Sequence, residues 1–145
     1  NKGQILAGVY LITVDKKLYV FADCTINISP DAQTLANIAL AASEVSKRYN
    51  PDEQIRIAML AFSSFGSSQH EECSKVAQAI EILREADSSL CVEGEMQADV
   101  ALNFDLQKME FPFLRLSQQY VKSSILLQHC KAPPSSLSLH RFYNP

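Results

Sequence analysis

A hydroxyl-rich loop follows the most continuously apolar stretch of the chain. The loop spans residues 63–68 and contains Ser63, Ser64, Gly66 and Ser67. At the carboxyl end of a buried strand, backbone N–H groups and the dipole of the next helix attract anions, and hydroxyls beside a glycine would let a phosphate approach. The loop lacks the Gly-Lys-Ser/Thr of a P-loop. A polar turn whose hydroxyls cap the next helix is the simpler interpretation, and the loop alone does not exclude it.

A second polar cluster follows an earlier apolar stretch that ends at Ala22. Asp23 and Asn27 would lie at the carboxyl end of that strand, where both could face a cleft and bind polar ligand groups. Alternatively, they form Asx turns that satisfy backbone groups of their own loop. The residues themselves leave the two interpretations even.

The third candidate is the acidic segment that contains Glu95, Gln97 and Asp99. Glu95 and Asp99 are four residues apart, so a helix beginning near Glu95 would place them on one face. An acidic pair could act as general acid and base or orient a substrate. Acidic side chains that favour the dipole of the first helical turn are the simpler interpretation.

Composition limits the function classes. The 145 residues suit one domain, 47% of them are apolar, and the formal charge of −3 gives no basic excess for nucleic acid. No apolar run reaches the roughly 18 residues of a membrane span. The chain begins with Asn1 and carries no signal-peptide pattern, so we expect a fragment of a cytoplasmic protein. The cysteines form no metal-binding spacing, and we expect four reduced, mostly buried thiols: Cys24, Cys73, Cys91 and Cys130.

Strands and helices are expected to alternate along most of the chain. Residues 8–14 and 18–22 predict a hairpin, and Ser29 with Pro30 predicts the start of a helix. The capping box of Ser68 and Glu71 predicts the next helix, where His70 is interpreted as a surface or capping residue. The remaining expected elements are a buried strand over 55–62, a short strand over 90–92 and a helix over 95–103. This alternation predicts an α/β domain.

Several motifs in order resemble the phosphate acetyl/butyryltransferase superfamily. The segment 21–27 (Phe-Ala-Asp-Cys-Thr-Ile-Asn) is similar to its F-x-A-D-[TC]-x-V-N motif, and 57–67 looks like its strand and loop. Phosphotransacetylases usually carry Ser-Thr-Lys-Gly-Ser in this loop, whereas Phe65 stands here at the lysine position. With 93–103 and the Phe-Pro-Phe-Leu-Arg-Leu of 111–116, the variants resemble the C-terminal domain of bacterial NADP-dependent malic enzymes.

The resemblance implies a three-layer α/β subdomain of the phosphotransacetylase (isocitrate/isopropylmalate dehydrogenase-like) fold with an N-terminal β-hairpin, formed by residues 1–116. It implies a fragment of a malic enzyme that decarboxylates malate to pyruvate, in which this domain senses acetyl-CoA and builds a homo-oligomer. The NADP and Mg²⁺ or Mn²⁺ sites would lie in a missing N-terminal half, so no catalytic or metal-binding residue is expected here, and the fragment alone would be inactive. We expect no nucleic-acid or membrane partner.

Two alternatives remain beside the malic enzyme. One is a true phosphate acetyltransferase, which transfers acetyl between CoA and phosphate, and the other is an interaction module without a ligand. If the resemblance holds, the acyl-CoA or phosphate cleft would be lined by nine residues: Asp23, Asn27, Ser63, Ser64, Gly66, Ser67, Glu95, Gln97 and Asp99.

The tail, residues 117–145, departs from the superfamily pattern. It has no acidic residue and no glycine, and Ser, Gln, His and Pro crowd its end. A helix or strand is expected around 120–128 and irregular chain elsewhere. One hypothesis is a truncated or frameshifted gene, because a one-base shift over 122–140 permits a sequence close to the family's helix.

Overall fold

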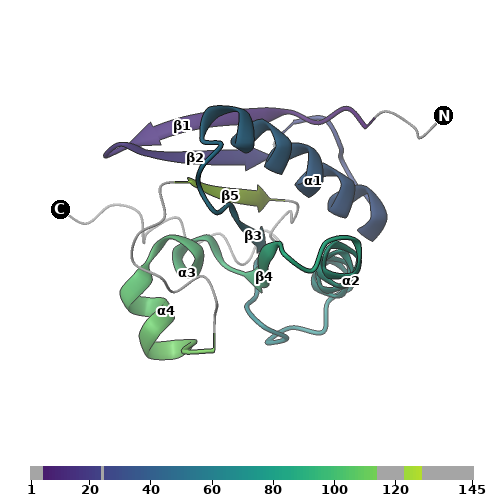
Figure 1. The fold of residues 1–145 in the computed structure, drawn as a ribbon. Helices are drawn as coiled ribbons and strands as arrows, with labels where there is room; N and C mark the ends of the chain where they lie inside the picture. Colours follow the sequence, from purple (N-terminus) through teal and green to yellow (C-terminus); the bar gives the residue numbers. More distant parts are fainter. Residues whose placement is uncertain (1–4, 24, 114–122, 129–145) are drawn as a thin grey trace.

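The structure, a computed structural model, describes residues 5–23, 25–113 and 123–128. In this part of the chain one five-stranded sheet has the order β1-β2-β5-β3-β4. Its strands are β1 (Val9–Val14), β2 (Lys17–Ala22), β3 (Arg56–Leu60), β4 (Cys91–Met96) and β5 (Ser123–Gln128). β2, β5, β3 and β4 run parallel, and only β1 is antiparallel to its neighbour. The carboxyl ends of four strands therefore lie along one edge of the sheet (Figure 1).

The N-terminal hairpin is confirmed, with a tighter turn than the sequence indicates. Val14 pairs with Lys17, which leaves Asp15 and Lys16 as a two-residue turn. Both residues have positive φ angles, 48° and 64°. Two such angles define a type I′ turn, whose twist matches that of the flanking strands.

Helices cover both faces of the sheet, so the predicted three-layer α/β arrangement is confirmed (Figure 1). Ile57 and Met59 of β3 point towards α1 (Ala32–Tyr49) and α2 (Glu71–Ala86). Ala58 and Leu60 belong to the opposite cluster with α3 (Ala98–Leu102) and α4 (Phe104–Glu110). This alternation is the period of two of a strand buried on both faces.

Both long helices begin later than the sequence predicts. Asp31 rather than Ser29 caps α1, because its side chain accepts a hydrogen bond from the Thr34 amide at 2.7 Å. At α2 the Nδ1 of His70 accepts from the Glu72 amide at 3.2 Å, so His70 takes the place predicted for Ser68. In each case an acceptor closer to the first turn satisfies the amide that the helix leaves free.

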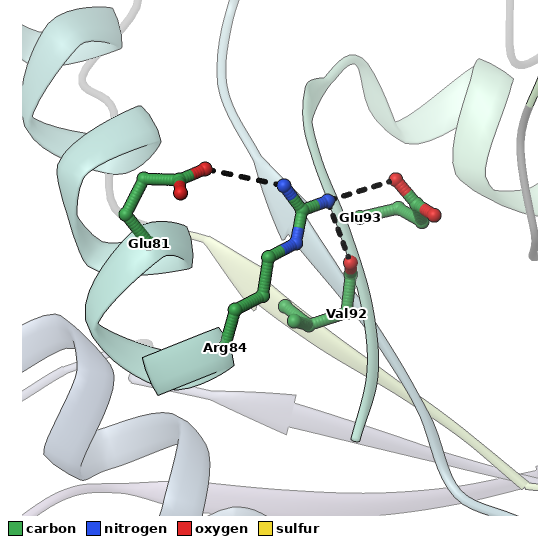
Figure 2. A network of polar contacts seen from close by, with 4 residues as sticks. All are labelled: Glu81, Arg84, Val92 and Glu93. Carbon is green, nitrogen blue, oxygen red and sulfur yellow. Dashed lines mark hydrogen bonds and ion pairs between the residues drawn. The ribbon is translucent and has the colours of Figure 1, made fainter. Parts of the chain in front are cut away.

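An arginine attaches α2 to the edge strand β4. Figure 2 shows the Arg84 guanidinium between Glu81 of its own helix and Glu93 of β4, at 3.1 and 3.3 Å. The same guanidinium donates a hydrogen bond to the Val92 carbonyl oxygen at 3.3 Å. The network therefore joins α2 to both a side chain and the backbone of β4. It lies near the start of β4, whereas Glu95 lies near the end of that strand.

The predicted tail contributes a strand to the middle of the sheet. β5 lies between β2 and β3 and is parallel to both, which is the strand alternative for residues 120–128. The rest of the tail, 117–122 and 129–145, lies outside the described residues, and the boundary near 116 and the frameshift hypothesis stay predictions. Among the described helices, none has the length and apolar character needed to cross a bilayer.

Candidate ligand-binding site

The loop after β3 folds around the side chain of Glu95. Glu95 is 4% exposed, and its Oε1 accepts hydrogen bonds from the Gly66 amide at 2.8 Å and from Ser63 Oγ at 3.1 Å. The Phe65 amide donates to the backbone oxygen of Glu95 at 2.8 Å. Phe65 and Gly66 have positive φ angles of 49° and 79°, which direct two successive amides towards one residue. A buried carboxylate thus occupies the position that the sequence suggests for an external anion.

Glu95 reaches this position from a strand rather than from a helix. The predicted helix over 95–103 is wrong in its first residues, because β4 continues to Met96 and α3 begins at Ala98. Gly94 permits the extension: its φ is 142°, and a Cβ there would lie 2.5 Å from the Met59 carbonyl oxygen. A polar Glu-Gly-Glu sequence resembles a turn, yet here it packs tightly against β3.

Ser64, Ser67 and Gln97 complete the loop's internal contacts. The Gln97 amide donates to Ser64 Oγ and the Ser64 amide donates to Ser67 Oγ, both at 3.1 Å. The Ser67 amide donates to the Ser64 carbonyl oxygen at 3.1 Å, and Gln97 Nε2 donates to the Phe62 carbonyl oxygen at 2.6 Å. The structure therefore joins two of the predicted clusters into one network. They are residues 63–67, called the serine loop below, and the acidic segment.

At residues 64–67 this network leaves hydroxyl groups, rather than backbone amides, for a ligand. The amides of residues 64–67 all donate within the protein. Ser64 Oγ and Ser67 Oγ each accept a hydrogen bond, so each retains its own O–H as a donor. Among the described residues neither hydroxyl donates to a protein acceptor, and Ser67 is exposed.

Asp99 does not join the site. Its Oδ1 accepts a hydrogen bond from the Val100 amide at 2.9 Å, within the first turn of α3. Glu95 lies in a strand and Asp99 in a helix, so the predicted acidic pair on one helix face is wrong. The dipole of the short helix α3 is the interaction that remains for Asp99.

Asp23 and Asn27 form a separate network at the end of β2. Asp23 accepts hydrogen bonds from the amides of Gly8, Thr25, Ile26 and Asn27, and from the Asn27 side chain. Although burial raises its pKa, the hydrogen bonds from Asn27, Gly8 and Thr25 outweigh that effect and lower the pKa of Asp23 to about 2. Each oxygen of the carboxylate accepts amides of its own loop, which agrees with the Asx interpretation of this cluster, and Oδ1 also holds the more distant Gly8 amide.

The two networks share an edge of the sheet without meeting. β5 separates β2 from β3, so their ends are two strand spacings, about 10 Å, apart. Among the described residues, no hydrogen bond joins Asp23 or Asn27 to the loop of residues 63–67. The structure places both at the carboxyl edge, as expected, but brings only the loop and Gln97 into one arrangement around Glu95.

Three aromatic rings beside the loop were not singled out from the sequence as a site. Phe65 packs against Phe111 and Phe113, with ring centroids 4.9 and 5.1 Å apart. Phe113 is 64% exposed, so the cluster offers an apolar surface that includes Phe65 of the loop. The Phe-Pro-Phe sequence of 111–113 is the signal that could have indicated it.

Cys73 lies behind the loop and is a free thiol. It is 1% exposed, and its Sγ is 3.2 Å from Ser63 Oγ. Cys91 is also a thiol and is half-buried, whereas Cys24 and Cys130 lie outside the described residues. Across the described part of the chain, no three His, Cys, Asp or Glu side chains gather closely enough to share a metal ion.

The chain is similar to known proteins over most of its length. The profile of the family "Phosphate acetyl/butaryl transferase" matches residues 1–120. A phosphate acetyltransferase of Bacillus subtilis (strain 168) is 43% identical over 95 residues, which are 66% of this chain and 29% of that protein. A phosphate acetyltransferase of Nitratidesulfovibrio vulgaris is 33% identical over 109 residues, 75% of this chain and 15% of that protein.

Solved structures agree with the sequence comparisons. A phosphotransacetylase from Streptococcus pyogenes superposes with a TM-score of 0.71 and 35% identity, covering 83% of this chain and 36% of that one. The EutD phosphotransacetylase from Staphylococcus aureus superposes with a TM-score of 0.67 and 28% identity, covering 83% of this chain and 37% of that one. The chain thus spans little more than a third of the structures it matches.

These comparisons overturn the expected malic enzyme. The relatives at 33–43% identity are phosphate acetyltransferases, and both structural neighbours are phosphotransacetylases. The substitution of Phe65 for the usual loop lysine therefore does not indicate a malic enzyme. The NADP and divalent metal of that expectation, and its regulatory role, lose their basis.

Proposed function

Because the chain belongs to the phosphate acetyl/butaryl transferase family, we propose that it forms part of the acyl-CoA site of a phosphate acetyltransferase. Such an enzyme transfers an acetyl group between the sulfur of CoA and an oxygen of phosphate. The part of the site in this chain is the serine loop, residues 63–67, together with Gln97.

One observation carries the proposal beyond family membership. At the carboxyl edge of the sheet, where α/β proteins bind ligands, the Ser64 and Ser67 hydroxyls are fixed by amides that donate to their oxygens. Two preorganised O–H donors suit the oxygen atoms of a thioester or of an amide in the CoA arm. Their geometry is held from behind by Glu95, which binds the loop through Ser63 and Gly66.

We propose further that this chain binds the acyl donor without turning it over. Its share of the two solved phosphotransacetylases is 36% and 37%, so most of the fold that would enclose a bound acyl group comes from other residues. An enclosed site is what excludes water from a reactive acyl group.

The test is a calorimetric titration of the chain with acetyl-CoA, beside an assay of acetyl transfer from acetyl phosphate to CoA. We expect saturable binding, no turnover, and a melting temperature that rises with ligand concentration. Removing both hydroxyls (S64A together with S67A) should weaken binding about tenfold or more. D99A is the control and should bind like the wild type. Absence of heat and of thermal stabilisation at millimolar acetyl-CoA would rule the proposal out.

A further inference from the structure

We propose that the serine loop, residues 63–67, takes the uncharged acyl-pantetheine part of the ligand and rejects phosphate. This inference rests on the proposed function and specifies which chemistry the loop recognises. It reverses the interpretation of the loop as a phosphate cradle, which the sequence pattern suggests.

The loop amides already have acceptors within the protein. A phosphate site at such a turn uses several backbone N–H groups aimed at one anion. Here the two amides in the left-handed region, those of Phe65 and Gly66, donate to Glu95 at 2.8 Å each. The amides of Ser64 and Ser67 are also engaged within the loop. Binding a phosphate there would require breaking these contacts.

The negative charge of Glu95 also disfavours a phosphate at this loop. Glu95 places a carboxylate, 4% exposed, directly behind the loop, where the low dielectric screens it poorly. A phosphate dianion at the Gly66 amide would lie beside that carboxylate, and like charges at such a distance repel. Residues 63–68 contain no Lys or Arg that could offset the repulsion. A neutral thioester or amide carries no such penalty.

The serine loop also contributes to an apolar surface. Phe65 lies between the two serines in sequence and packs on Phe111 and Phe113. Phe113 remains 64% exposed, so a methyl group or methylene chain that packed on its ring would be removed from water together with the ring surface. One loop thus carries two O–H donors and an aromatic ring of this cluster, which matches an oxygen-bearing, otherwise apolar group, the chemistry of S-acetylpantetheine.

The experiment follows the amide signals of residues 64–67 and Gln97 in ¹⁵N-labelled full chain by NMR. The probes are S-acetylpantetheine, inorganic phosphate and adenosine 3′,5′-bisphosphate, the charged half of CoA. S-acetylpantetheine should shift these signals saturably, and equal concentrations of the two phosphates should leave them in place. F65K should weaken the binding of S-acetylpantetheine about tenfold and allow phosphate to shift the loop signals. S89A, which removes a hydroxyl from the turn before β4, is the matched control and should change neither response.

Each outcome of these titrations supports or overturns the inference. Phosphate that shifts the loop signals of the wild type, or S-acetylpantetheine that fails to shift them, overturns the inference. If acetyl-CoA binds in the calorimeter while S-acetylpantetheine leaves the loop unchanged, the proposed function stands and this inference falls. If acetyl-CoA does not bind at all, both are wrong.

Discussion

The Oε1 atom of Glu95 lies 2.8 Å from the amide nitrogen of Gly66, 29 residues earlier in the chain. This contact ties the end of β4 to the loop after β3 and fixes the position of the candidate site. Because the carboxylate also accepts from Ser63 Oγ, one buried side chain holds the serine loop at two points, Ser63 and Gly66.

Removing that carboxylate should destabilise the fold. In E95A the Gly66 amide and the Ser63 hydroxyl lose their acceptor, and we expect the free energy of unfolding to fall by about 3 kcal/mol. E95Q retains an acceptor oxygen and should lose about 1 kcal/mol. Urea unfolding measures both. Equal losses for the two variants, or none for E95A, would contradict the role assigned to the contact.

Two glycines in the left-handed region offer a matched comparison. A Cβ at Gly94 would lie 2.5 Å from the Met59 carbonyl oxygen, whereas nothing lies within 4 Å of one at Gly66. G94A therefore combines backbone strain with a clash and should cost about 3 kcal/mol or more. G66A adds strain alone, about 1 kcal/mol. Thermal unfolding of both variants would refute this account if their order were reversed.

The titration of Asp23 should make the stability of the fold depend on pH in the acidic range. Its pKa is lowered from the ordinary 3.8 to about 2, so it stabilises the folded state fully above pH 4, and the contribution is lost as pH falls towards 2. D23N should therefore show a shallower decline of melting temperature between pH 4 and pH 2. Some slope should persist, because hydrogen bonds from Thr34 and Ser89 lower the pKa values of Asp31 and Asp87. A slope identical to that of the wild type would show that Asp23 titrates normally.

The bridge between α2 and β4 predicts a smaller, salt-sensitive effect. R84M removes the contacts with Glu81, Glu93 and the Val92 carbonyl (Figure 2) and should cost about 1 kcal/mol. K75M breaks the ion pair with Glu72 inside α2 and should cost about 0.3 kcal/mol. Denaturation at low and high salt compares them. A larger loss for K75M would contradict the bridge's role.

The fold could be predicted further than the site. The apolar strand over 55–62, the hairpin and the amphipathic helices carry periodicities that follow directly from burial, and the structure has them. The two long helices begin later than predicted because Asp31 and His70 cap their free amides in place of the predicted serines, Ser29 and Ser68.

The site could be predicted only in part. Eight of the nine expected residues lie in hydrogen-bonded networks at the expected edge, but the network around Glu95 depends on contacts across 29 to 35 residues, which no local pattern encodes. Gly66 contributes an amide to Glu95, and Asp99 remains in its own helix turn. The strand around Glu95 escaped prediction because its extension depends on the close approach of Gly94 to Met59.

The most direct test of the account is a crystal structure of this chain with acetyl-CoA. We predict that oxygen atoms of the acetyl-pantetheine arm lie within hydrogen-bond distance of Ser64 Oγ and Ser67 Oγ, while Glu95 keeps its contact with Gly66. Acetyl-CoA bound elsewhere, or a phosphate group of the ligand on the Gly66 amide in place of Glu95, would contradict it.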